Sequence, residues 1–417
     1  MTTFELMRRP RILFIHQNYP AQFGGIAKYL HDRGWDVLCA TARGEIEPGR
    51  TVEMSNGVKV RGYRRKREPS DDISRYLRPL ESAVVNGQAF ANAAIDLRKD
   101  GFVPDLICAH SGWGSGSFAK AVWPEARFIS YLEWWYSYPP RDVDYDPKAN
   151  HEDLRAAALC RNLPFFLDFQ SSDAILTPTR FQAQEIPAAY APITTILHDG
   201  VDCRYFAPDP ATRPACLDGK VPDGAPIVTY ATRGMEPKRG FPEFMAALEK
   251  VMLAYPDVHA VIAGADSVHY EGPRKTERSY KKEALDRYEY DETRLHFVGR
   301  LPLTEYRDLL QRTDVHVYLT QPFVLSWSLL EAMACGAPLV VSDCAPVREA
   351  IPYGTAARFA KHQHIPELVA AIGAMLDAPE TGRGMGLKAR ELAVENFASE
   401  HIYPAKEAYF RMVIGRK

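Results

Sequence analysis

Short apolar runs alternate with amphipathic stretches along the first half of the chain. The runs are rich in β-branched side chains, and the stretches between them, at residues 23–33 and 76–99, have helical periodicity. Such alternation predicts βαβ units and a parallel sheet whose strands are buried on both faces. Strands are expected at residues 11–16, 35–41, 58–64, 105–110, 127–134, 173–179 and 194–201.

A segment at residues 207–226 interrupts this alternation. It is rich in proline and glycine and has no periodicity, so we interpret it as a linker. The alternation then restarts, and the chain from Ile365 onward is predicted to be helical, with a break near Pro379. In this second half, strands are expected at residues 226–233, 258–265, 294–300, 315–320 and 337–343.

These two halves predict two Rossmann-like, doubly wound α/β domains, since 417 residues are too many for one ordinary core. The expected parts are an N-terminal domain at 1–206, the linker at 207–224, a C-terminal domain at 225–397, and a last helix at about 398–417 that packs back on the N-terminal domain. Such sheets bind ligands at the carboxyl ends of their strands, where the strand order reverses. We therefore expect a ligand site between the two domains.

Composition narrows the class of protein and its partners. The net charge of −2 gives no general attraction to nucleic acid. The seven cysteines are scattered without a C-x-x-C pair, which favours a reducing compartment over a disulfide framework. The first residues lack a secretory signal, and no stretch approaches the ~20 apolar residues of a membrane span. We expect a cytoplasmic protein, either free or peripheral on the inner face of the cytoplasmic membrane.

Basic side chains concentrate at residues 59–67, which include the run Arg64–Arg67. With Trp134 and Trp135 in the same predicted domain, this segment is suited to docking on anionic lipid headgroups. A solvated surface loop is the alternative interpretation.

Three aspartates alternate in the stretch RDVDYDPK. The spacing of Asp142, Asp144 and Asp146 suggests ligands for a divalent metal. However, Pro147 stands where a calcium loop needs glycine, and the neighbouring prolines indicate an exposed loop. We therefore expect no metal at this segment.

Two glycine-rich turns follow predicted strands. Gly24 and Gly25 open the first helix, where backbone N–H groups can approach an anion; a tight turn between strand and helix is the alternative. The second turn, HSGWGSGSF, is close to a dinucleotide-binding fingerprint. Because Ser117 takes the place of the third glycine and the preceding strand is not the first, a nicotinamide enzyme is disfavoured.

Polar side chains also mark the ends of predicted strands. His110 ends one strand and points into the expected crevice, although a purely structural histidine is the alternative. Arg233 ends another strand and Lys238 follows five residues later, an arrangement suited to clamping a diphosphate; a solvated turn is the alternative. Glu331 lies in the apolar helical run LLEAMACG, where a buried carboxylate is costly unless something pairs with it.

The order of these motifs resembles that of the retaining glycosyltransferases of family 4, which have the GT-B architecture. The resemblance covers nearly the whole chain, and LLEAMACG is its strongest single element. In chain order the shared motifs are Gly24-Gly25, His110 in DLICAHS, HDGVD with Phe206, Arg233 and Lys238 as R-x4-K, Gly299 in HFVGR, and LLEAMACGAPLVVSD.

This resemblance implies a nucleotide-diphosphate-sugar donor that is held mostly by the C-terminal domain. It implies that Glu331 accepts hydrogen bonds from the ribose hydroxyls, and that Arg233 and Lys238 stabilise the charge on the departing diphosphate. His110 is implied to contact the donor sugar and to act in catalysis with these two cations. Further donor contacts are implied for Gly24, Gly25, Gly299, Arg300, Ser326, Trp327 and Ser328.

The implied reaction is transfer with retention to a glycan or lipid-linked glycan acceptor in cell-surface polysaccharide biosynthesis. No Ser/His/Asp or Cys/His set stands out as an enzymatic nucleophile. The resemblance therefore implies attack from the front face, with the leaving phosphate taking the acceptor's proton. Cationic side chains replace a metal, so neither a metal nor another cofactor is expected, and no nucleic acid is expected as a partner.

Phe323 and Glu133 differ from the residues that the family usually has at or near their positions. The family usually has a second glutamate eight residues before Glu331, which binds the transferred sugar, whereas this chain has Phe323. That departure keeps open a second hypothesis, a non-catalytic nucleotide-sugar-binding subunit of a glycosyltransferase complex. Glu133 lies near the place where the family often has a histidine or aspartate, and we expect it to face the acceptor or the donor sugar.

Overall fold

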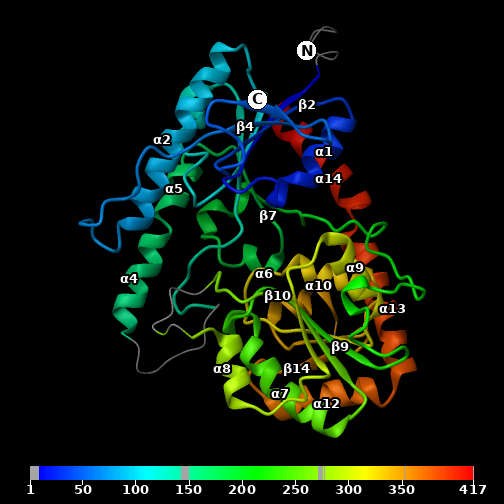
Figure 1. Cartoon of the computed structure of the whole chain (residues 1–417). Coiled ribbons are helices and arrows are strands. Elements are labelled where there is room, and N and C mark those ends of the chain that lie inside the picture. The colour runs from blue at the N-terminus through cyan, green and yellow to red at the C-terminus, as the bar shows by residue number, and fades with distance from the viewer. Residues whose placement is uncertain (1–8, 142–149, 271–275, 277, 353, 417) are drawn as a thin grey trace. The chain divides into compact units, whose positions relative to one another are not determined.

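The structure is a computed structural model that describes residues 9–141, 150–270, 276, 278–352 and 354–416 (Figure 1). The chain divides into two compact units. Unit 1 comprises Met1–Asp199 and His401–Lys417, and unit 2 comprises Gly200–Glu400. The proline-rich segment at 207–226 falls within unit 2, where a short turn at Ala215–Leu217 buries Leu217.

Unit 1 is built on an eight-stranded sheet in the order β3-β4-β2-β1-β5-β6-β7-β8. Its strands are β1 (Arg11–Ile15), β2 (Asp36–Thr41), β3 (Thr51–Glu53), β4 (Lys59–Gly62), β5 (Leu106–His110), β6 (Arg127–Tyr131), β7 (Ala174–Thr177) and β8 (Thr194–Ile196). Its helices are α1 (Gly24–Asp32), α2 (Arg78–Lys99), α3 (Ala119–Val122), α4 (His151–Arg161), α5 (Leu163–Phe169), α6 (Arg180–Ala183) and most of α14 (Ser399–Gly415).

Unit 2 is built on a six-stranded parallel sheet in the order β11-β10-β9-β12-β13-β14. Its strands are β9 (Ile227–Gly234), β10 (His259–Ala265), β11 (Leu295–Gly299), β12 (Val315–Tyr318), β13 (Leu339–Ser342) and β14 (Arg358–Ala360). Its helices are α7 (Phe241–Ala254), α8 (Tyr280–Arg287), α9 (Leu303–Arg312), α10 (Trp327–Ala334), α11 (Ala345–Ala350), α12 (Ile365–Leu376) and α13 (Pro379–Phe397).

The central strands of each sheet are buried on both faces, which is why they are continuous apolar runs. In β1, Ile12 and Phe14 join one buried cluster, whereas Leu13 and Ile15 join another. Successive side chains of a strand point to opposite faces, so the two clusters lie on the two sides of the sheet. The doubly wound architecture predicted for both halves of the chain is therefore confirmed.

Two strands are missing from the sequence-based prediction. β3 and β14 have three residues each, and both contain exposed positions, so neither forms an apolar run. β3 also pairs antiparallel with β4, which makes it an exception to the predicted parallel order. The predicted helix break near Pro379 is confirmed between α12 and α13, and a second break at Ala398 separates α13 from α14.

Helix α14 joins unit 1 through a buried polar network. The ammonium of Lys406 contacts Asp199 at 3.1 Å, and the Tyr131 hydroxyl donates to the same carboxylate at 2.8 Å. Tyr403 of α14 packs near Tyr29 of α1, and Figure 1 shows these two helices side by side. In the described part of the chain, no helix combines the length and apolar character needed to span a bilayer.

Candidate functional site

The strand order reverses at one place in each sheet, and the predicted site residues gather there. In unit 1, β1 lies between β2 and β5, so consecutive connections leave β1 in opposite directions. In unit 2, β9 lies in the same way between β10 and β12. The carboxyl ends of the central strands at such a switch point form a ligand crevice.

In unit 1 two histidines stand at this switch point. His16 directly follows β1, His110 ends β5, and their rings meet edge to face with centroids 4.7 Å apart. Burial is the main cause that lowers the pKa of His16 to about 2, and the charge of the neighbouring His110 is the second. This imidazole is therefore neutral. Its Nδ1 accepts the Asn18 N–H at 2.9 Å, which leaves the proton on Nε2. His16 was not singled out in the sequence, where its signal was the polar end of the run RILFIH.

His110 is held between two oxygen atoms. Its Nδ1 lies 3.0 Å from the Ser111 carbonyl, and its Nε2 lies 3.5 Å from an oxygen of Glu133. The Gln22 amide donates to the other Glu133 oxygen at 2.7 Å and so orients the carboxylate. The structure thus brings Glu133 to His110, which the sequence alone did not connect.

Gly24 and Gly25 form the first turn of α1, and both have tightly packed surroundings. A Cβ on Gly24 would lie 2.6 Å from the Pro20 Cβ, and one on Gly25 would lie 2.0 Å from the Tyr403 hydroxyl. A side chain at either position would therefore displace a neighbour, so close packing is one reason for glycine here. Their predicted contact with the donor stays a prediction.

The loop after β5 is organised by a buried aspartate that the sequence analysis missed. Asp168 of α5 accepts from the Ser117 hydroxyl at 2.6 Å and from the Gly112 N–H at 3.4 Å. Burial raises the pKa of Asp168 to about 6. Ser117, the residue that spoils the dinucleotide fingerprint, therefore has a structural partner 51 positions away.

In unit 2 the two predicted cations follow β9 but differ in exposure. Arg233 is the penultimate residue of β9 and is exposed, whereas Lys238 lies in the short turn Pro237–Arg239 and is buried. The Lys238 ammonium stands 4.7 Å from the centre of the Phe323 ring. Phe323 follows β12, so this cation–π contact crosses the switch point between β9 and β12.

Two charged residues beside this pair support it and were missed in the sequence. Glu236 is fully buried and accepts the N–H groups of His269 and Tyr270 at 3.1 and 2.9 Å. Arg239 donates to the Thr320 hydroxyl at 2.8 Å and covers the Tyr270 ring at 4.9 Å. The Tyr270 ring in turn meets Phe323 edge to face at 5.7 Å. The segments after β9, β10 and β12 are thus locked together around Lys238.

Glu331 lies on α10, whose first turn faces the same end of the sheet. Ser326 caps this helix: its side chain accepts the Ser328 N–H, and its own N–H donates to the Tyr318 hydroxyl at 3.2 Å. Trp327 is exposed. Burial raises the pKa of Glu331 to about 7, and the neighbouring Tyr306 side chain offsets part of that rise.

Gly299 ends β11, on the other side of β9 from β12, and Arg300 directly follows it. Gly299 has a φ of +69°, which favours glycine. Burial lowers the pKa of His269, and the charges of Arg233 and Arg300 lower it further. These two arginines therefore share one electropositive neighbourhood at the carboxyl ends of β9 and β11.

The basic run Arg64–Arg67 is partly neutralised. Arg65 pairs with Glu68 at 3.2 Å and Arg67 pairs with Glu81 at 2.7 Å. Asp142, Asp144 and Asp146 lie outside the described residues. Among the residues that are described, no group of three or more His, Cys, Asp or Glu side chains is placed to hold a metal ion.

Family models match both units. Residues 33–206 match the model described as "Glycosyl transferase family 4 group", and residues 225–378 match "Glycosyl transferases group 1". Glycogen synthase of Mycobacterium tuberculosis is 24% identical over 93% of this chain and 91% of its own length. Phosphatidyl-myo-inositol mannosyltransferase of Propionibacterium freudenreichii is 32% identical over 120 residues, 28% of this chain and 26% of its own.

The fold is shared with solved protein structures. Anabaena HepE, solved in complex with UDP-glucose, superposes with a TM-score of 0.68 at 16% identity, covering 96% of this chain and 99% of HepE. The two matched models together cover most of the chain, one in its N-terminal half and one in its C-terminal half. The chain belongs to the family 4 glycosyltransferases and has the GT-B fold.

Proposed function

We propose that this nucleotide-sugar-dependent glycosyltransferase retains the anomeric configuration and transfers a hexose to a glycan or lipid-linked glycan of the cell surface. The observation that carries the proposal is the arrangement at the switch point of unit 2. There a buried lysine follows β9, two arginines lie at the carboxyl ends of β9 and β11, and Glu331 lies on α10, the helix that follows β12. This set has one carboxylate for a ribose and several cations for a diphosphate.

The proposed chemistry needs no enzymatic nucleophile. The bond between the anomeric carbon and the diphosphate breaks, and the acceptor oxygen forms its bond on the same face. The acceptor's proton passes to an oxygen of the departing phosphate. Lys238, Arg233 and the first turn of α10 stabilise the negative charge that grows on that phosphate. Since these groups supply the positive charge, we propose that the reaction requires no metal.

The acceptor class rests on the relatives. One is named as a glycogen synthase and another as a phosphatidyl-myo-inositol mannosyltransferase, so the family members with similar sequences extend a glycan or glycosylate a lipid. We propose an acceptor from this range, reached in the cytoplasm or at its membrane. Because Arg65 and Arg67 are paired, Arg64 and Lys66 are the stronger candidates for contact with anionic lipid.

The function is tested by a donor screen followed by turnover. We expect one class among UDP, GDP, ADP and CDP sugars to raise the melting temperature, and its sugar to be transferred with the anomeric configuration kept, as read by proton NMR. Activity is expected to survive EDTA. An inverted product, or activity that EDTA abolishes and Mg²⁺ restores, would contradict the mechanism. Tight donor binding with neither transfer nor hydrolysis would favour the non-catalytic subunit.

Phe323 provides a further prediction, because its ring holds the Lys238 ammonium. We expect Phe323→Leu to lower kcat/KM about fivefold, since a partly desolvated cation–π contact is worth about 1 kcal/mol. Phe323→Tyr keeps the aromatic face and serves as the matched control, with activity near that of the unmodified protein. Equal activity of all three proteins in initial-rate assays would remove Phe323 from the site.

A further inference from the structure

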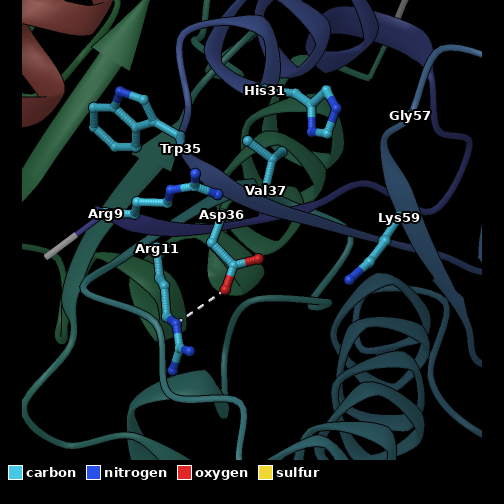
Figure 2. Close-up of a pocket in the computed structure, with 8 residues that line it drawn as sticks. All are labelled: Arg9, Arg11, His31, Trp35, Asp36, Val37, Gly57 and Lys59. Carbon is cyan, nitrogen blue, oxygen red and sulfur yellow. Dashed lines mark ion pairs between the residues drawn. The ribbon is translucent and has the colours of Figure 1, made fainter.

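A cavity lies in unit 1 at the opposite edge of the sheet from His16 and His110. Its volume is about 690 Å³, and its lining includes the residues that begin three adjacent parallel strands, Arg11 of β1, Asp36 of β2 and Lys59 of β4. Figure 2 shows these side chains together with Arg9 and His31. A strand of five residues spans roughly 16 Å, so this cavity is separate from the carboxyl-edge crevice. Its volume is that of a small-molecule site.

The cavity carries surplus positive charge. Three of its lining residues are cationic at neutral pH and one is acidic. Arg11 forms an ion pair with Asp36, with its Nε 2.9 Å from the carboxylate, and Figure 2 marks this pair. Arg9 and Lys59 are exposed, and within the described part of the chain neither is paired with a carboxylate. Two cations are therefore left to attract a ligand with more than one negative charge.

Packing contacts hold two walls of the cavity in place. Trp35 is buried, and its indole N–H donates to Glu407 of α14 at 3.1 Å. On the opposite wall, Gly57 has a φ of +81°, and a Cβ there would lie 2.6 Å from Nε2 of His31. The positive φ favours glycine at this turn between β3 and β4, and the His31 ring lies against it. Such preformed walls reduce the ordering that a ligand must impose.

We propose that this cavity binds the phosphate group of a small ligand, with Arg9 and Lys59 as the charged contacts and His31 as a hydrogen-bonding partner. A guanidinium offers paired donors to phosphate oxygens and an ammonium adds a point charge. The volume leaves space for a sugar or glycerol moiety beside the phosphate. The phosphate belongs either to a soluble monoester or to a lipid headgroup, and the two sources are separated by experiment.

The test is a titration of the full chain with inorganic phosphate and glucose 1-phosphate, followed by phosphorus NMR, and a sedimentation assay with phosphatidylglycerol vesicles. The informative variant is Arg9→Ala/Lys59→Ala, which removes exposed side chains and preserves the fold. Lys28→Ala, an exposed lysine on α1 outside the cavity, is the matched control. Lys238→Ala is the second control, because it would lower the affinity if the phosphate bound in unit 2 instead.

We expect the double variant to lose at least about tenfold in affinity, while Lys28→Ala and Lys238→Ala retain it, because a charged hydrogen bond contributes about that factor. Loss confined to the vesicle assay assigns a lipid headgroup, and loss for the soluble phosphates assigns a soluble monoester. Unchanged binding in the double variant, loss in Lys238→Ala alone, or no binding of any probe at about 10 mM would overturn the proposal. None of these outcomes depends on transferase turnover.

Discussion

Glu331→Ala should weaken nucleotide-diphosphate binding at least about tenfold, because each hydrogen bond to a charged group contributes about 1.5–3 kcal/mol. In the free protein, burial raises the pKa of Glu331 to about 7, so the carboxyl is about half protonated at neutral pH. Ribose hydroxyls that donate to it favour the ionised form, and binding at pH 7 should therefore release up to about half a proton. Calorimetry in two buffers of different ionisation enthalpy measures both quantities. Unchanged affinity for every nucleotide diphosphate would exclude this role.

The same carboxyl makes stability depend on pH. The unfolded chain loses this proton near pH 4.5, whereas the folded protein keeps it until about pH 7. Between these values the folded state binds more protons, so stability falls as pH rises and levels off above pH 7, by ~3 kcal/mol in all. We expect Glu331→Gln to melt higher than the unmodified protein at pH 8 and equally at pH 4.5. Glu391→Gln, at an exposed position of α13, is the control and should leave the melting temperature unchanged at both pH values.

Lys238→Ala should lower kcat roughly 100-fold or more while KM for the donor changes less than about tenfold. Lys238 is buried, and in the proposed mechanism its ammonium lies near the point where charge grows on the leaving phosphate, where burial strengthens its electrostatic effect. An interaction that is stronger in the transition state than in the bound substrate appears in kcat. Arg233 is exposed, so Arg233→Ala should show the same pattern with a smaller loss.

Two variants separate charge from packing at this position. Lys238→Arg keeps the positive charge over Phe323 and should recover part of the lost kcat. Lys250→Ala removes an exposed lysine of α7 in the same unit and should leave both constants unchanged. Equal losses in kcat and donor affinity for Lys238→Ala, or no recovery with arginine, would reduce Lys238 to a structural role.

The long strands were predictable because burial on both faces leaves a continuous apolar run. β1, β2 and β5 lie within one or two residues of the sequence prediction. β3 and β14 were not predictable, since three residues at the edge of a sheet need few apolar side chains and take their conformation from the neighbouring strand. Tertiary pairing therefore decides these two short edge strands, whereas local sequence decides the long central strands.

The site residues show the same difference between local signals and contacts made only in the fold. Lys238 and Glu331 stand in local motifs and were found in the sequence. The Lys238–Phe323 contact, the orientation of Glu133 by Gln22 and the buried Asp168 depend on partners 51 to 111 positions away or on ring geometry. One sequence carries no direct record of such pairs. Phe323 looked like a lost carboxylate in the sequence, and the structure adds that its ring faces a predicted catalytic cation.

The link between Lys406 and Asp199 has a consequence for protein synthesis. These residues are 207 positions apart, and all of unit 2 lies between them in the sequence. On the ribosome, Asp199 emerges while its partner is still untranslated, so unit 1 cannot complete its core until unit 2 has been made. The N-terminal unit is thus the last to finish folding, and until α14 arrives it exposes apolar surface of the kind that chaperones bind.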